Sequence, residues 1–193
     1  KIGLAQTFGI FLILFMEFGS SLMVTRKISR IKNKNSLLKS FLGKVITFKI
    51  LLIPLAALFS LLVIALVPIF KTNPEFILLV LIGSIFQAIT PTWYFQGIEK
   101  MGKIVFPKIF FRLFGFVLVL IFVKSPLDGW IVLSLFSLSS ILICIYLILL
   151  LIKEVGFFKI SFPSESISIF KNSFYSFIIT IAPIVYQNMS VII

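Results

Sequence analysis

The apolar run FILLVLIGSIFQAITPTWYFQ, residues 76–96, decides the fold class. A helix needs roughly 20 mostly apolar residues to cross a hydrocarbon core of about 30 Å, and this run reaches that length without a charged residue. Trp93 and Tyr94 stand near its end, and such amphipathic rings favour the depth of the lipid headgroups, with lipid on one side and water on the other. The run therefore predicts a membrane-spanning helix that ends at the membrane surface.

Similar runs recur along the chain. Hydrophobic residues make up 60% of the sequence and charged residues 12%, with a mean hydropathy of +1.21, which leaves too little polar surface to cover a soluble globule. The strict alternation of an outer-membrane barrel is absent. We predict an all-α, polytopic transmembrane helix bundle of about six spans, at residues 2–24, 45–70, 76–96, 104–123, 129–152 and 170–193.

Positive charges alternate between the predicted connections. Residues 26–44 hold seven lysines and arginines, whereas residues 71–75 hold only Lys71. The third connection is again basic, the fourth holds only Lys124, and the fifth, residues 153–171, is basic once more. This is the pattern of the positive-inside rule and places the basic connections in the cytoplasm. We interpret the net charge of +12 as topogenic and attractive to membrane lipids, not as a nucleic-acid surface.

The sequence offers little for enzymatic chemistry. It contains no histidine, and its single cysteine, Cys144, excludes a disulfide framework and a cysteine metal site. No short apolar core is followed by a small-residue cleavage site, so no signal peptide is visible. We expect no cofactor, no metal and no enzymatic activity.

A motif at the end of the 76–96 run is specific enough to indicate a family. An aromatic pair is followed by Phe-Gln-Gly-x-Glu-Lys-Met; its residues are Trp93, Tyr94, Phe95, Gln96, Gly97, Glu99, Lys100 and Met101. The string resembles the one that closes the fourth transmembrane helix of Wzx-type O-antigen flippases, in the polysaccharide-exporter branch of the MATE-like superfamily. The resemblance implies a MATE-like bundle of two six-helix lobes.

The resemblance also suggests how the chain divides. Residues 1–152 correspond to spans two to six of the first lobe. Residues 153–169 contain Gly156, Pro163 and several phenylalanines, and predict a cytoplasmic amphipathic linker. Residues 170–193 resemble the family's seventh helix, so we expect a truncated chain that ends one helix into a second lobe.

Charged residues inside the spans are the first candidates for a substrate cavity, because a charge at mid-bilayer costs about 2.5–3.5 kcal/mol on insertion scales. Glu17 either lines a cavity or reaches water from a packed helix end. Lys49 and Arg112 either extend to the cytoplasmic headgroups or face the cavity, and for Lys108 we favour the headgroups. Relatives carry an acid before the Phe-Gly pair, a lysine at the position of Lys49 and an arginine at the position of Arg112, and the resemblance thus favours the cavity for these three.

Neutral polar residues extend the candidate cavity. Gln87 shares a helical face with Gly83, Thr90 and Tyr94, and Gln187 lies on a polar arc of the last span. Each arc is equally explained by ordinary helix packing. Several such arcs in neighbouring spans favour a shared polar interior.

These observations predict a transporter of the bacterial inner membrane. The resemblance implies that it flips an undecaprenyl-diphosphate-linked oligosaccharide to the outer leaflet for O-antigen or capsule assembly, with a polysaccharide polymerase or ligase as further partners. Ion coupling and mass action both remain open as energy sources. Two alternatives are a MATE-type cation or drug antiporter, which would favour an anionic lumen, and a membrane polymerase or ligase, which would show large outer loops.

Overall fold

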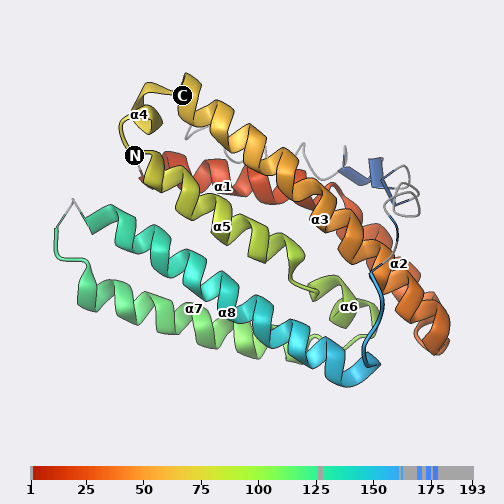
Figure 1. Ribbon diagram of the computed structural model, residues 1–193. Coiled ribbons are helices and arrows are strands. Elements are labelled where there is room, and N and C mark those ends of the chain that lie inside the picture. The colour runs from red at the N-terminus through yellow and green to blue at the C-terminus, as the bar shows by residue number, and fades with distance from the viewer. Residues whose placement is uncertain are drawn as a thin grey trace.

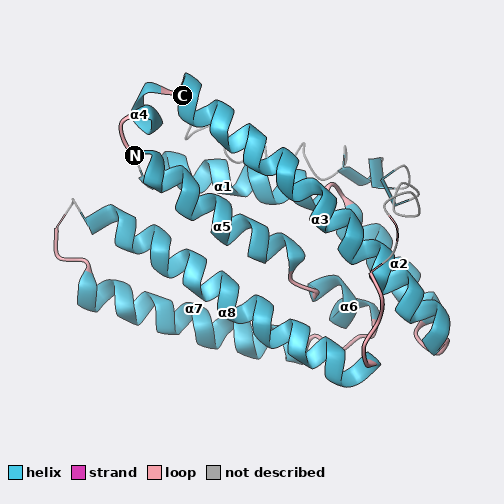
Figure 2. Cartoon of the chain, in the orientation of Figure 1, coloured by secondary structure: helices cyan, strands magenta, loops and turns pink. Residues whose placement is uncertain are grey.

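The described part of the chain consists of helices and the turns that join them. A computed structural model describes residues 2–125, 128–160, 162, 169–170, 173–174 and 176–177. Figure 2 shows helices connected by loops, and no strand occurs among these residues. The all-α class predicted from the apolar runs is confirmed.

Several of the helices are long enough to cross a bilayer. In chain order they are α1 (Ile2–Glu17), α2 (Ser20–Ile31), α3 (Asn35–Leu66), α4 (Pro68–Lys71), α5 (Pro74–Ile89), α6 (Thr92–Gly97), α7 (Gly102–Phe122) and α8 (Gly129–Val155). Within the described part of the chain, four stretches have the length and composition of a membrane span, namely α3, α5 with α6, α7 and α8; the bent pair α1–α2 is a fifth when it is counted as one span. The protein is a multi-pass membrane protein. The sixth predicted span, residues 170–193, lies almost wholly outside the described residues. Of the predicted linker, residues 153–160, 162 and 169 are described, and its first three residues belong to α8.

Helix α5 occupies the middle of the bundle. It packs against α8 on one side and against α1 and α3 on the other, while α7 packs on α8 (Figure 1). Small residues allow the close approach of α5 and α8, since a Cβ atom on Gly83 would lie only 2.8 Å from Ser137 Oγ. Glycine and serine at such contacts are typical of helix pairs in membranes.

The first predicted span is broken in two. Phe18 and Gly19 both have positive φ, 44° and 64°, and the axes of α1 and α2 differ by 43°. At Gly19 a Cβ atom would lie 2.2 Å from the backbone nitrogen of Phe177, so glycine is required by both conformation and space. The sequence interpretation of residues 2–24 as one helix is therefore wrong, and Glu17 lies at the break.

The third predicted span is also interrupted, at Pro91. Helix α5 ends at Ile89, and Thr90 has ψ 123°, away from helical values. A proline disfavours helical geometry in the residue before it and has no N–H to continue the ladder. Pro91 thus separates α5 from α6, whereas α3 continues through Pro54.

The basic segment 26–44 is not a loop. Helix α2 continues to Ile31 and α3 begins at Asn35, so only residues 32–34 turn. Lysine and arginine are good helix formers. Their charge keeps them out of the hydrocarbon core, but it is compatible with a helix. Charge correctly separated this segment from the apolar spans, but it could not distinguish a solvated helix from a loop.

The turn between α7 and α8 is closed by Asp128. The backbone N–H groups of Lys124 and Ser125 donate to Asp128 Oδ2 at 3.1 and 2.8 Å. The hydrogen bond from Lys124, followed by that from Ser125, lowers the pKa of Asp128, because both donors favour the charged carboxylate. The turn therefore keeps its closing bonds at neutral pH.

Cysteine labelling tests the predicted topology. Ser36, in the first turn of α3, and Thr72, in the turn between α4 and α5, are both exposed. In a Cys144→Ser background we expect an impermeant thiol reagent, added to spheroplasts, to label Thr72→Cys and to leave Ser36→Cys unlabelled until the membrane is permeabilised. The opposite pattern would invert the topology.

Candidate functional site

A polar groove runs between α1, α5, α7 and α8. Three adjoining pockets of about 90, 330 and 160 Å³ all include Arg112 in their walls. We call their combined lining the Arg112 groove. Its polar residues are Gln6, Glu17, Gln87, Thr90, Thr92, Lys108, Arg112, Ser139 and Ser140. Polar side chains from several helices thus converge between helices that are otherwise largely apolar.

Arg112 is held in this groove by two contacts. Its Nη2 donates to Gln87 Oε1 at 3.4 Å, and its guanidinium carbon lies 4.7 Å from the centroid of the Phe136 ring. Stacking on an aromatic face orients a guanidinium without using its N–H donors. Among the described residues only Gln87 accepts a hydrogen bond from it, so the remaining donors are available to a ligand in the groove.

The smallest of the three pockets combines charges of both signs. Glu17 lies at the end of α1, where the helix breaks, and it shares this pocket with Lys108 and Arg112. Lys108 and Arg112 are four residues apart on α7 and therefore lie on one helical face. Two cations and one carboxylate give the pocket one net positive charge when all three are ionised.

The structure thus brings together three of the five predicted cavity residues. Glu17, Gln87 and Arg112 line one pocket, and Lys108, which we had assigned to the headgroups, joins them. Lys49 does not line the three pockets. It is 1% exposed, its Nζ has no hydrogen-bond partner among the described residues, and its charge interacts with that of Glu17 behind the groove wall.

The fifth predicted cavity residue, Gln187, lies outside the described residues.

The small and neutral polar residues of the helices have two different roles. Gln87 and Ser140 line the groove, whereas Gly83 packs against Ser137 and Gly115 against Ser139. Packing and cavity thus both contribute to the polar stripes.

The motif residues do not line the groove. Trp93, Tyr94 and Phe95 are 1%, 4% and 0% exposed, so these rings pack inside the bundle instead of against lipid, and the headgroup depth expected for Trp93 and Tyr94 stays a prediction. Helix α6 packs against α2, and the apolar cluster that holds its aromatic rings includes residues of α8. There the Thr25 hydroxyl donates to the Trp93 carbonyl at 3.3 Å and the Tyr94 hydroxyl to Glu154 Oε2 at 3.3 Å.

The charged residues of the motif region join three parts of the chain. Glu99 pairs with Lys32, in the turn between α2 and α3, at 3.1 Å. Lys103 pairs with Glu154 at the end of α8, and Lys100 lies 3.6 Å from the same carboxylate. The role of Glu154 as an ion-pair partner was not predicted from the sequence. The only indication was its place as an acidic residue in a connection predicted to be basic.

Gly97 permits the close contact between the motif and α2. A Cβ atom at this position would lie 2.7 Å from Ile28 Cγ2 and 3.0 Å from the Thr25 carbonyl oxygen. We expect Gly97→Ala to lower the melting temperature of the purified protein, because overpacking costs about 1–3 kcal/mol. Gly102→Ala is the matched control, since its Cβ would meet only a Phe106 ring atom at 3.8 Å. Equal melting temperatures for the two variants would refute a packing role for Gly97.

Comparison with known proteins identifies the family. A family model described as "Polysaccharide biosynthesis protein" matches residues 1–193. The chain is 30% identical over 126 residues to a protein of Escherichia coli (strain K12) described as "Putative O-antigen transporter"; the alignment covers 65% of this chain and 30% of that protein. No solved structure matches the chain. Because the family model covers the chain from end to end, the chain belongs to the polysaccharide biosynthesis protein family.

Proposed function

We propose that the protein flips an oligosaccharide linked to a polyprenyl diphosphate from the cytoplasmic to the outer leaflet of the bacterial inner membrane. The observation that carries this proposal is the Arg112 groove, a polar and net cationic path between apolar helices. A diphosphate and its sugars cannot cross hydrocarbon unaided, because their polar groups would lose water without replacement partners. The groove supplies such partners.

The side chains of the groove suit the two chemical parts of this substrate. Arg112 offers a planar fork of donors that matches phosphate oxygens, and Lys108 adds a second positive charge. Gln87, Thr90 and Ser140 offer the amide and hydroxyl groups that hydrogen-bond sugars. Glu17 limits the net charge of the pocket, so that a bound anion can also leave it.

Transport by this protein requires a second surface to close the groove. We propose that residues 170–193 begin a second lobe and that the two lobes rock about the groove between them, as in transporters built from repeats. The E. coli relative is described as a "Putative O-antigen transporter", which supports transport over catalysis. The net cationic pocket favours an anionic substrate over the cations that a drug antiporter would carry.

Complementation tests the proposal. The intact reading frame that contains this chain should restore surface polysaccharide to a strain that lacks its own flippase. In proteoliposomes the purified protein should make a short-chain polyprenyl-diphosphate sugar in the inner leaflet accessible to an external lectin. Restored surface glycan without transport in proteoliposomes would point to an indirect role. Failure of both assays with correctly inserted protein would reject the function.

A further inference from the structure

Two pockets at the lysine-rich end of the bundle lie apart from the Arg112 groove. The first, about 180 Å³ between α2 and α3, is lined by Lys27, Ile31, Leu37, Ser40, Phe41 and Lys44. The second, about 460 Å³, lies between α3 and the segment after α8 and is lined by Lys39, Ser40, Phe157, Phe158, Lys159, Ile160 and Phe162. Because both include Ser40, they form one continuous surface. We call it the Ser40 surface.

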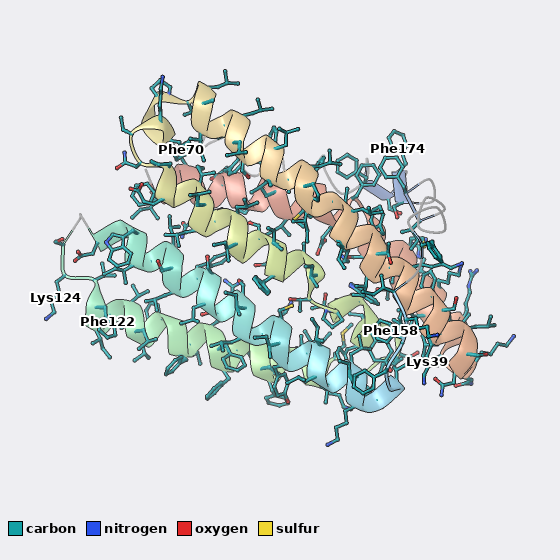
Figure 3. All side chains as sticks on the ribbon, in the orientation of Figure 1. Lys39, Phe70, Phe122, Lys124, Phe158 and Phe174 are labelled. Atoms are coloured by element: carbon teal, nitrogen blue, oxygen red, sulfur yellow. The ribbon has the colours of Figure 1, made fainter. Side chains whose placement is uncertain are left out.

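The Ser40 surface lies at the end of the bundle that the charge pattern places in the cytoplasm. Figure 3 shows Lys39 and Phe158 near one another at this end, with Phe122 and Lys124 at the opposite end. Helices α2 and α3, which carry most of its residues, hold the basic segment 26–44. The surface therefore meets the inner headgroup layer of the membrane.

The walls of this surface combine amines with aromatic and aliphatic side chains. Lys27 Nζ is placed 4.6 Å from the centroid of the Phe41 ring, and a Cβ atom on Gly156 would lie 3.2 Å from Lys39 Nζ. Among the described residues that line the two pockets, none is acidic. The described part of the walls thus offers positive charge next to apolar side chains.

The apolar part of the surface is unusually open. Phe157, Ile160 and Phe162 are 86%, 66% and 77% exposed. Such side chains are unfavourable in water and favourable at the boundary between headgroups and acyl chains, where amphipathic segments bury their apolar face. A ligand that carries a phosphate next to hydrocarbon would contact both parts of the surface at once.

We propose that the Ser40 surface is a binding site for an anionic phospholipid of the cytoplasmic leaflet. The lysines contact the headgroup phosphate, and Phe157, Ile160 and Phe162 lie against the upper acyl chains. A soluble acidic partner would match the charge but would leave the aromatic residues without a role, whereas a phospholipid matches both. The site is separate from the Arg112 groove, so this inference does not depend on the proposed transport function.

Native mass spectrometry of the purified full-length protein tests the site with phosphatidylglycerol as the probe. We expect phosphatidylglycerol to bind at least tenfold more tightly than phosphatidylcholine. The double substitution Lys39→Gln with Lys159→Gln should weaken phosphatidylglycerol binding at least tenfold, because each lysine near an anionic lipid contributes about fivefold in affinity. The matched control, Lys71→Gln with Lys124→Gln, removes two lysines from the opposite end and should change binding less than twofold.

Two further measurements identify the ligand. Phe157→Ser combined with Phe162→Ser should weaken phosphatidylglycerol binding while every lysine remains in place. Millimolar inorganic phosphate should not displace the lipid. Equal affinity for phosphatidylglycerol and phosphatidylcholine, or equal losses in the two lysine double variants, would overturn the proposal. Displacement of the lipid by phosphate would instead indicate a site for free phosphate.

Discussion

Arg112→Ala should reduce surface polysaccharide export to background while the protein remains at its normal level in the membrane. The expected loss is large because each hydrogen bond to a charged group contributes about 1.5–3 kcal/mol, or roughly 10- to 150-fold in substrate retention. The only described hydrogen bond of Arg112 is the long contact with Gln87, 3.4 Å, so the fold itself should tolerate alanine. Surface glycan staining, with an immunoblot of membrane protein, measures both quantities.

Arg112→Lys separates charge from geometry. Lysine keeps the positive charge but loses the planar fork and the stacking on Phe136, so we expect partial export. Lys124→Ala is the control, because it removes a cation from the outer turn, away from the groove. Normal export by Arg112→Ala would show that the groove does not bind the substrate anion through Arg112. Equal loss in Lys124→Ala would show that total charge matters more than position.

The spans could be predicted because length and apolarity are local properties. The predicted ranges 104–123 and 129–152 agree with α7 and α8 within a few residues, and Pro91 marked a real break. The bend at Phe18 and Gly19 was not predictable in the same way. Its glycine is required by the backbone of Phe177, which is far away in the sequence.

The candidate groove could be predicted only in part. Glu17 and Arg112 were identifiable because a charge within an apolar run demands an explanation, and the structure places both in one pocket. Lys49 gave the same signal, yet it is buried and does not line the three pockets, although its charge interacts with that of Glu17. Helical periodicity gives the face of a residue on its own helix, but which neighbour that face meets is decided by packing.

The packing of Trp93 and Tyr94 was likewise not predictable from their own helix. Their amphipathic rings suit the membrane surface, but both are buried inside the bundle. Helix α6 packs against α2, and the Tyr94 hydroxyl donates to Glu154 at the end of α8. The motif therefore contributes to this structure through packing and ion pairs rather than through contact with the groove.

This structural role of the motif region predicts a stability difference between two glutamates. Glu154→Gln should lower the free energy of unfolding by about 1–3 kcal/mol, because the Glu154 side chain is only 16% exposed and Lys103 and Lys100 would lose their shared carboxylate. Glu99→Gln is the matched substitution. Its side chain is 77% exposed, and exposed ion pairs contribute about 0–1 kcal/mol.

Thermal unfolding of the purified variants measures the difference. We expect the melting temperature of Glu154→Gln to fall by roughly 2–10 °C and that of Glu99→Gln to stay near that of the unchanged protein. Lys103→Met combined with Glu154→Gln should cost less than the sum of the single changes, because the two residues share one interaction. Equal shifts for the two glutamate variants, or strict additivity in the double variant, would contradict the pairing. Arg112→Ala should leave the melting temperature unchanged, so these variants separate the residues that hold the bundle together from those that line the groove.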